Sequence, residues 1–361
     1  MQILKRLILL SLTVLPFSLM SCNSGSSSST PTIQYQTLNY TGSLPAGGST
    51  GLTGIRGVRG SSDVYITGSY YAESMNNGTL YKGPISGGGT YYVYNYPSSL
   101  ESTTSGVNVY SAENGEGGNV LLVGTYTVSQ LGGFHNFGFL YNGPVTESQS
   151  ADDWQTLVIP DSLANNESVN NTIPHSIMGN LVVGNYETPS TAGNAFIYNI
   201  VTESYIAFSY PGNDVRYTSA YGVWFNGGES YTIVGGYSHE SDGSISYGFI
   251  VDYNESTNAF DNWESYTYNN EPAAITHFEG ITSDGAGGYN LAGSGLESAS
   301  EASFVHVGRT SSGGFGAAVW TNVSYPGSST TTSDTVYQNY LLGVYEMPNV
   351  SGLNGYVATI P

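Results

Sequence analysis

Basic side chains are scarce in this sequence, in which 7 Lys and Arg stand against 27 Asp and Glu and give a formal net charge of −20. Proteins that hold nucleic acid or anionic lipid electrostatically carry clusters of Lys and Arg. The composition therefore excludes a nucleic-acid partner. A net charge so far from zero also favours a soluble monomer.

Cysteine is scarce as well, with Cys22 as the single example, which excludes an intramolecular disulfide and a paired-cysteine metal motif. The sequence also contains no phosphate-binding loop, no His-Glu-x-x-His and no Gly-x-Gly-x-x-Gly. We therefore predict no cofactor. A cation such as calcium, bound inside the fold, stays an alternative that no motif indicates.

Long apolar runs are absent too, and no window keeps a 3.6-residue apolar period, so helices should be nearly absent. What the sequence does contain is 48 Gly and 31 Tyr, with many Ser and Thr. This composition favours β-structure. Aromatic and β-branched residues are too plentiful for a disordered chain.

The first residues are typical of a bacterial export signal, because Lys5 and Arg6 precede an apolar run that is too short to span a bilayer. Leu19-Met20-Ser21-Cys22 then resembles the lipobox of bacterial lipoproteins, in which the cysteine is lipidated and becomes the first residue of the mature protein. An ordinary cleaved signal peptide is the alternative.

The lipoprotein resemblance implies a signal peptide over 1–21, a palmitate-type lipid on Cys22 and a Ser-rich tether over 22–31. The membrane would then be a partner through the lipid. Asn23, rather than Asp, follows the cysteine, and this favours the outer membrane, with the protein facing either the periplasm or the cell surface.

Two markers repeat along the rest of the chain. The first is Gly-x-Tyr after an apolar run, and its glycines are Gly68, Gly124, Gly184, Gly235 and Gly343, with Gly293-Ser-Gly295 as a degenerate copy. The second is an aromatic residue five positions before another large residue. These pairs are Tyr91/Tyr96, Trp154/Ile159, Tyr205/Tyr210, Trp263/Tyr268 and Trp320/Tyr325, and Tyr35/Tyr40 comes first in the chain.

Units of about 50–60 residues with four short strands each are typical of the blades of a β-propeller. Six units predict an all-β, six-bladed β-propeller over 32–361, with four antiparallel strands per blade. The last unit lacks its outer strand, so we expect residues 33–41 to supply it and to close the ring. A linear β-solenoid is the competing architecture. We interpret both markers as blade-to-blade packing, with glycine allowing close approach of neighbouring backbones.

The segments Gly193-Asn-Ala-Phe-Ile-Tyr-Asn199 and Gly138-Phe-Leu-Tyr-Asn142 resemble the repeats of bacterial extracellular proteins with a His-Ala-Phe strand. In the first segment Asn194 stands where the family has His. The resemblance covers one strand per unit and implies an exported propeller without any catalytic residue.

Residues that lead into the innermost strand of a propeller surround its central channel, where ligands commonly bind. Aligning the six units predicts that one residue of each lies there, just before the inner strand: Thr53, Ser105, His175, Tyr221, Glu279 and Asp334. Arg56, Asn108, Trp224 and His277 should lie close by. Of these, we predict binding roles for His175, Tyr221, Glu279, Asp334, Arg56 and Asn108. The alternative is that they bond channel water and cap strand ends.

Three functions stay open on the sequence. The one we favour is a binding module for a glycan, a protein or another envelope component. The second is a hydrolase or lyase that acts on glycans, since Glu279 and Asp334 could form a carboxyl pair. The third is a purely structural surface protein, and the fold alone does not select among them.

Overall fold

The structure is a computed structural model that describes residues 32–42, 44–45, 47–130, 133–191, 193–242, 245–271, 275–296 and 300–361. The predicted signal peptide, the lipid site Cys22 and the tether therefore lie outside the described residues. Within the part of the chain that is described, no helix is long and apolar enough to cross a membrane. Short 3₁₀ turns lie at Glu116–Gly118, Ala151–Asp153, Asp161–Leu163, Glu240–Asp242 and Tyr268–Asn270.

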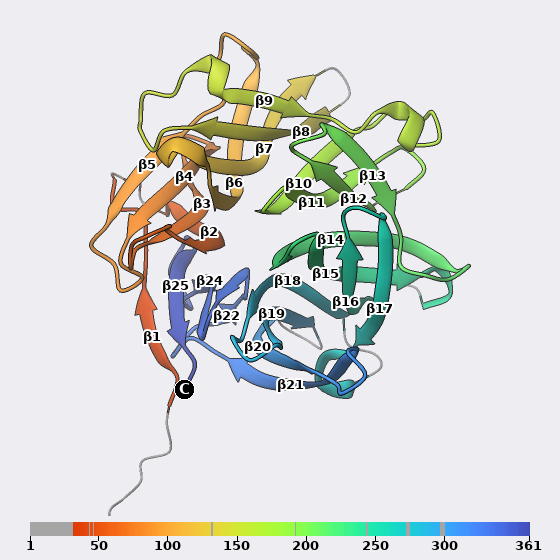
Figure 1. Cartoon of the computed structure of the whole chain (residues 1–361). Helices are drawn as coiled ribbons and strands as arrows, with labels where there is room; N and C mark the ends of the chain where they lie inside the picture. Colours follow the sequence, from red (N-terminus) through yellow and green to blue (C-terminus); the bar gives the residue numbers. More distant parts are fainter. Residues whose placement is uncertain are drawn as a thin grey trace, which may run out of the picture. The chain divides into compact units, whose positions relative to one another are not determined.

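Residues 33–361 form one unit, in which six antiparallel sheets are arranged in a ring (Figure 1). The first strands of neighbouring sheets contact one another all round the ring, so they are the inner strands. In blades one to three the strands, from inner to outer, are β2 (Ser49–Gly57), β3 (Val64–Ala72), β4 (Met75–Gly83), β5 (Thr90–Tyr94); β6 (Thr104–Asn114), β7 (Val120–Gln130), β8 (Gly133–Gly143), β9 (Trp154–Leu157); β10 (Asn171–Met178), β11 (Leu181–Glu187), β12 (Asn194–Asn199), β13 (Ser204–Phe208). Blades four and five are β14 (Val215–Gly227), β15 (Ser230–His239), β16 (Tyr247–Asn254), β17 (Ala259–Tyr266); β18 (Ile275–Ser283), β19 (Tyr289–Leu296), β20 (Ser300–Arg309), β21 (Phe315–Val323).

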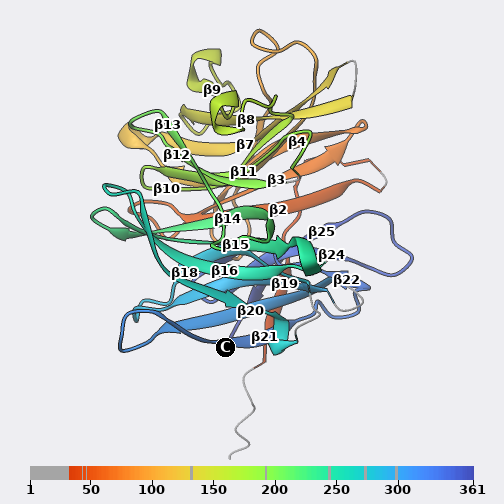
Figure 2. The ribbon, with the colours of Figure 1, turned by 90° about the vertical axis from the view of Figure 1, so that its right-hand side faces the viewer.

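The sixth blade combines the two ends of this unit. Its inner position is shared by two short strands, and its members are β22 (Thr330–Thr331), β23 (Thr335–Tyr337), β24 (Tyr340–Glu346), β25 (Asn354–Thr359) and the outer strand β1 (Gln34–Thr37). Strand β1 runs antiparallel to β25, with Tyr35 opposite Ala358, and both views show the two strands side by side (Figures 1 and 2). The prediction of a six-bladed β-propeller closed by its N-terminal strand is confirmed, and the linear solenoid is excluded.

The core lies between the blades rather than within one sheet. One cluster joins Val183 and Ile197 of blade three to Ile233 and Phe249 of blade four, and all four side chains are buried. A fully buried aliphatic or aromatic side chain contributes roughly 1.5–3 kcal/mol relative to an exposed one. The sheets therefore hold each other in place face to face, and the inner strands keep their positions around the axis.

A recurring aromatic contact joins consecutive blades. Tyr210, which follows the outer strand of blade three, stacks on Tyr237 of blade four with ring centroids 3.6 Å apart, and it meets Trp263 edge-on at 5.2 Å. The same two contacts recur where Tyr40 meets Tyr70 and Tyr91, where Tyr96 meets Tyr126 and Trp154, and where Tyr325 meets Tyr345 and Tyr35. Both sequence markers belong to this joint, so blade-to-blade packing is confirmed for the aromatic residues.

The glycines of Gly-x-Tyr have a different role from the one we expected. A Cβ atom at Gly235 would clash with the carbonyl oxygen of Ser219, on the inner strand of the same blade. Gly68, Gly124, Gly184 and Gly343 meet inner-strand carbonyls in the same way. These glycines therefore allow close approach within a blade, at the level where the inner strand departs from regular pairing. The close approach of neighbouring blades is made by the aromatic rings.

Candidate functional site

Each of the first five inner strands contains a β-bulge opposite this glycine level. In β14 the register passes from Ala220 opposite Gly235 to Gly222 opposite Val234, which leaves Tyr221 without a cross-strand partner. Such an extra residue bends the strand and redirects a side chain. The bulged residues, together with Asp334 between β22 and β23, form what we call the bulge ring: Thr53, Tyr110, His175, Tyr221, Glu279 and Asp334.

Five of these six positions are those that the sequence alignment selected, but two details were wrong. Thr53, His175, Tyr221 and Glu279 lie within the inner strands, at the bulges, and not before them, while Asp334 lies between the two short inner strands of blade six. In blade two the bulge opposite the glycine level belongs to Tyr110. Ser105 lies five residues upstream, at a separate register shift of β6, and its hydroxyl donates to the carbonyl oxygen of Thr127 at 3.2 Å.

The error in blade two has a traceable cause. Ser105 is followed by Gly106 and Val107, which imitates the Gly-apolar pair that follows the bulge in blades one, four and five. In blade two the bulged Tyr110 is followed by Ser111 instead. The spacing to the Gly-x-Tyr glycine was the better signal, because Tyr110 precedes Gly124 by the same 14 positions that separate Tyr221 from Gly235.

The bulge ring lines a solvent-accessible space on the axis of the ring. Its members are half-buried, whereas the residues on either side of them in the inner strands are buried. Successive blades bring these side chains into contact: the rings of Tyr110 and His175 are 5.3 Å apart, and those of His175 and Tyr221 are 4.6 Å apart. On the other side, the Thr53 hydroxyl donates to the carbonyl oxygen of Val109 at 2.6 Å.

Two of the other predicted residues lie two positions upstream of the ring. His277 precedes Glu279, its ring lies 5.9 Å from that of Tyr221, and its Nε2 is 2.9 Å from the Ser246 hydroxyl. Asn108 precedes Tyr110, and its Oδ1 accepts a hydrogen bond of 3.0 Å from Asn76. Both lie toward the face where the inner strands begin, which we call the front face; the inner strands end at the back face.

Burial decides the protonation of the ring. It raises the pKa of Glu279 to about 8, with a further contribution from the nearby Asp334 carboxyl, and it raises the pKa of Asp334 to about 7. It lowers the pKa of His175 and of His277 to about 4. Burial raises the pKa of Tyr221 as well. At pH 7 the ring therefore carries no more than a partial negative charge, mainly on Asp334, in a protein of strongly negative net charge.

Arg56 closes the space behind the bulge ring. It lies three residues beyond Thr53, is 8% exposed, and reaches from blade one to three other blades. Its Nε is 3.6 Å from the Glu113 carboxylate, its Nη2 donates to the carbonyl oxygen of Ile177 at 3.1 Å, and its guanidinium lies 5.7 Å from the centre of the Trp224 ring. Arg56 and Trp224 thus form the floor of the site rather than its opening.

The bulge ring places hydrogen-bond donors, hydrogen-bond acceptors and aromatic rings around the axial space. Neutral carboxyl groups and neutral histidines both donate and accept, and Tyr110 and Tyr221 supply ring surfaces. Across the described residues, no three His, Cys, Asp or Glu side chains gather closely enough to hold a metal ion. The site is therefore suited to an uncharged polar molecule.

Comparison with known proteins bears on the fold. No protein-family model matches the chain, and no curated protein matches its sequence. Its fold is similar to that of a luciferin-regenerating enzyme, at 12% identity and a TM-score of 0.48 over 86% of this chain and 92% of that one. It is also similar to a Cellvibrio cellulosa α-L-arabinanase complexed with arabinohexaose, at 8% identity and a TM-score of 0.39 over 78% and 95% of the two chains.

A third similar structure is that of extracellular domains 1–2 of Drosophila semaphorin 1b, at 8% identity and a TM-score of 0.38 over 91% of this chain and 86% of that one. All three similarities concern the arrangement of the backbone. By its fold, the chain is a six-bladed β-propeller.

Proposed function

We propose that this protein is an exported, lipid-anchored β-propeller that binds an uncharged, polyhydroxylated ligand, such as part of a glycan, in its bulge ring. The observation that carries the proposal is the composition of the ring. Six equivalent positions, which a purely structural ring could fill with one residue type, hold His175, Tyr221, Glu279, Asp334 and two further hydroxyl side chains in one half-buried space.

The protonation of the ring supports an uncharged ligand. A phosphate or carboxylate would meet no positive side chain on the ring, because burial keeps His175 neutral at pH 7, and the Arg56 guanidinium in the floor is paired with Glu113. Hydroxyl groups would find acceptors and donors at the carboxyl groups, the imidazoles and the phenols. The Tyr221 ring provides an apolar face of the kind on which a sugar ring packs.

Binding is tested with the double variant His175→Ala/Glu279→Ala. The unmodified protein is expected to bind at least one member of a glycan array, and titration calorimetry should show the affinity of the double variant reduced by tenfold or more. Ser105→Ala is the matched control, because Ser105 lies outside the ring. Unchanged binding in the double variant would contradict the proposed site.

A second function is favoured by the carboxyl groups of Glu279 and Asp334. Both belong to the ring, and the pKa of Glu279 is raised to about 8, as a general acid at neutral pH requires. In a hydrolase or lyase acting on glycans, Glu279 would donate a proton to the leaving oxygen and Asp334 would act as base or nucleophile. Glu279→Gln should then abolish release of reducing sugar while binding persists. If the unmodified protein binds a glycan without cleaving it, the hydrolase or lyase function is excluded and the binding function remains.

The location of the protein is proposed from its N-terminal residues. Cys22 in its lipobox setting supports a lipid anchor, and Asn23 supports the outer membrane. Metabolic labelling with palmitate should label the protein that retains Cys22 and leave the Cys22→Ala variant unlabelled. The variant should also leave the membrane fraction. Membrane association that survives in Cys22→Ala would contradict the anchor.

A further inference from the structure

A polar cleft lies between blades four and five, on the back face and away from the bulge ring. It encloses about 470 Å³ and is lined by Asp252, Asn262 and Ser230 of blade four and by Tyr289 and Arg309 of blade five, among others. Sites for small molecules commonly enclose about 300–1,000 Å³, so the cleft has room for one or two sugar rings. Nothing in the bulge ring takes part in it.

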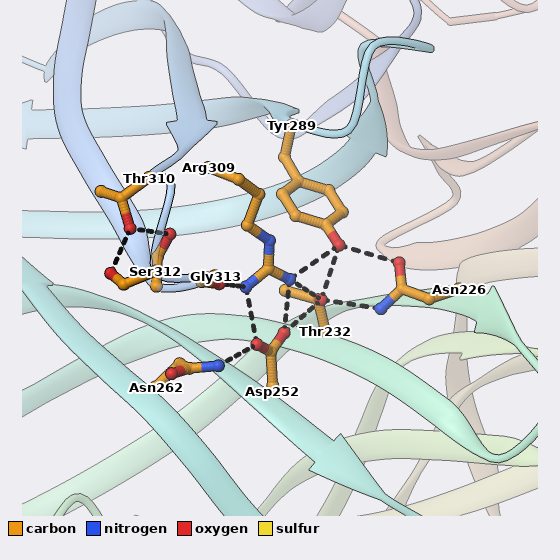
Figure 3. Close-up of polar contacts among 10 residues, drawn as sticks. Asn226, Thr232, Asp252, Asn262, Tyr289, Arg309, Thr310, Ser312 and Gly313 are labelled. Atoms are coloured by element: carbon orange, nitrogen blue, oxygen red, sulfur yellow. Dashed lines mark hydrogen bonds and ion pairs between the residues drawn. The ribbon is translucent and has the colours of Figure 1, made fainter.

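The floor of the cleft is a rigid, internally neutralised ion pair. Arg309 donates to both carboxylate oxygens of Asp252 at 2.6 Å, and the two strands β20 and β16 hold the pair from opposite sides (Figure 3). The guanidinium also donates to the Tyr289 hydroxyl at 3.1 Å and lies 4.0 Å from the centre of the Phe315 ring. A bidentate pair held in this way presents flat polar edges in a fixed orientation.

A β-bulge aims a further side chain into the cleft. The register of β16 and β17 shifts between Ile250 and Asp252, and Asn262 adopts a positive φ of 55° at this point. Its amide nitrogen donates to Asp252 at 2.8 Å (Figure 3). Asparagine adopts this conformation more readily than other non-glycine residues do, because its short polar side chain can form local hydrogen bonds. The bulge leaves the amide oxygen of Asn262 available beside the ion pair.

Groups with free hydrogen-bonding capacity surround this floor. Asp261 lies directly opposite Asp252 in the register of the two strands, and its side chain is exposed. In the described parts of the chain, neither its carboxylate nor the hydroxyl of Ser230 has a protein partner. A carboxylate next to an amide is a pair of groups that can hold two neighbouring hydroxyls of one ligand.

The joint between blades three and four shows that packing alone does not require such a cleft. There the Glu255 carboxylate accepts hydrogen bonds from the neutral amides of Asn199 at 2.6 Å and Asn180 at 3.3 Å, in place of an ion pair. The adjacent cavity, of about 400 Å³, is lined partly by the apolar Leu181, Ile197 and Ile206. The joint between blades three and four therefore has neither the ion pair nor the bulge that the cleft contains.

From this geometry we propose that the cleft is a second binding site, independent of the bulge ring, that takes a neutral sugar through Asp261, Asn262 and Ser230. Charge selects this class of ligand. The Arg309–Asp252 pair is internally neutral and Asp261 adds one negative charge, so an anionic sugar or a phosphate is repelled. A neutral sugar instead satisfies the free carboxylate, amide and hydroxyl groups.

The test is calorimetric titration of the full chain with glucose, galactose, arabinose and xylose, and with glucuronate as the anionic probe. At least one neutral sugar should bind, and the double variant Asp261→Asn/Asn262→Gly should weaken it by tenfold or more. Glycine accepts the positive φ, so this variant removes the amide without straining the bulge. Asp261→Asn alone touches no protein contact and should weaken binding in the same direction.

Two controls separate this site from others. Asp152→Asn makes the same charge change at an exposed position of blade two, and His175→Ala/Glu279→Ala disables the bulge ring; both should leave the affinity of the cleft unchanged. Sugar binding that disappears in the bulge-ring variant and survives in the cleft variant would overturn this proposal while supporting the first site. No binding of any neutral sugar, or a preference for glucuronate, would overturn it as well.

Discussion

Thr37 and Tyr345 lie 308 positions apart in the chain, and their side-chain hydroxyl oxygens are 2.9 Å apart. The Thr37 hydroxyl is also 2.8 Å from that of Tyr325. Blade two repeats this arrangement, with Thr156 of its outer strand 2.7 Å from the Tyr96 hydroxyl and 3.4 Å from that of Tyr126. Strand β1 thus supplies blade six with the contacts that an ordinary outer strand supplies to its own blade.

Thr37→Val should destabilise the closure of the ring. Valine keeps the shape of threonine and removes the hydroxyl, so the Tyr325 and Tyr345 hydroxyls lose a partner. Because Thr37 is exposed and water can take its place, the cost is about 0.5–1.5 kcal/mol. Urea unfolding measures the loss, and hydrogen exchange should quicken in β1 and β25. Thr156→Val is the matched control: it should cost a similar amount and leave exchange in β1 unchanged. Equal exchange in both variants would contradict a special role of β1.

Deletion of residues 32–42 should be far more damaging than any substitution in them. It removes β1 and also Tyr40, which packs between Tyr70 and Tyr91 of blade one. The edge of β25 is then left unpaired and can pair with other chains. We expect aggregation in light scattering and a lowered melting temperature. A monomer with unchanged melting would contradict closure by this strand.

The stability of the protein should fall as the pH rises from 6.5 to 8. Folding holds a proton on Glu279 up to about pH 8 and on Asp334 up to about pH 7, so the contribution of each carboxyl is complete at low pH and is lost as the pH rises through these values. His175 and His277 have lowered pKa values, so their contribution to the stability is lost as the pH falls. This loss occurs only between pH 6.5 and about 4.

Above pH 6.5 the carboxyl groups therefore act alone. Glu279 should lower the free energy of unfolding by about 2 kcal/mol between pH 6.5 and 8, less any screening by water in the ring. Urea unfolding at several pH values measures this slope. Glu279→Gln should remove its larger part and leave the smaller part, near pH 7, that comes from Asp334. Glu264→Gln, at an exposed position of β17, should keep the whole slope. A slope between pH 7 and 8 that is unchanged in Glu279→Gln would contradict the role of Glu279.

Gly295 should not tolerate a side chain, although its counterparts in other blades are tyrosines. A Cβ atom at Gly295 would lie 2.5 Å from the ring of Tyr268, which occupies the place of the missing tyrosine. Gly295→Ala should destabilise by about 1–3 kcal/mol, as overpacking of a core does. Gly51→Ala is the control, because its Cβ would meet nothing nearer than 3.6 Å. Calorimetry measures the melting temperatures of the two variants, and equal values would contradict the predicted clash at Gly295.

Asp252→Asn should loosen the joint between blades four and five. It leaves the guanidinium of Arg309, whose side chain is 23% exposed, without a carboxylate. Removing one partner of a buried pair costs about 3–5 kcal/mol, and partial exposure reduces this to about 2 kcal/mol. Glu255→Gln, which replaces a carboxylate that faces the neutral Asn199, should cost less. Equal losses in urea unfolding would contradict the stronger role of the ion pair.

The sequence alone determined the number of blades, the four strands of each blade and the closing strand. Periodic features carry this information: Tyr35 and Tyr40 have the same spacing as Trp154 and Ile159, so residues 33–41 are recognisable as an outer strand far from its blade. Local patterns also selected five of the six bulge positions. They failed at Tyr110, because β6 has two register shifts, at Ser105 and at Tyr110, and only its pairing with β7 shows that Tyr110 lies opposite the glycine level.

Only the tertiary structure decided what surrounds these positions. Burial, and not residue type, keeps Glu279 protonated and His175 neutral, and it depends on the packing of six blades around one axis. Arg56 became the floor of the site because it reaches blades two, three and four. The pairing of Asp252 with Arg309, 57 positions apart, follows from the angle between two sheets, for which the sequence carries no local signal.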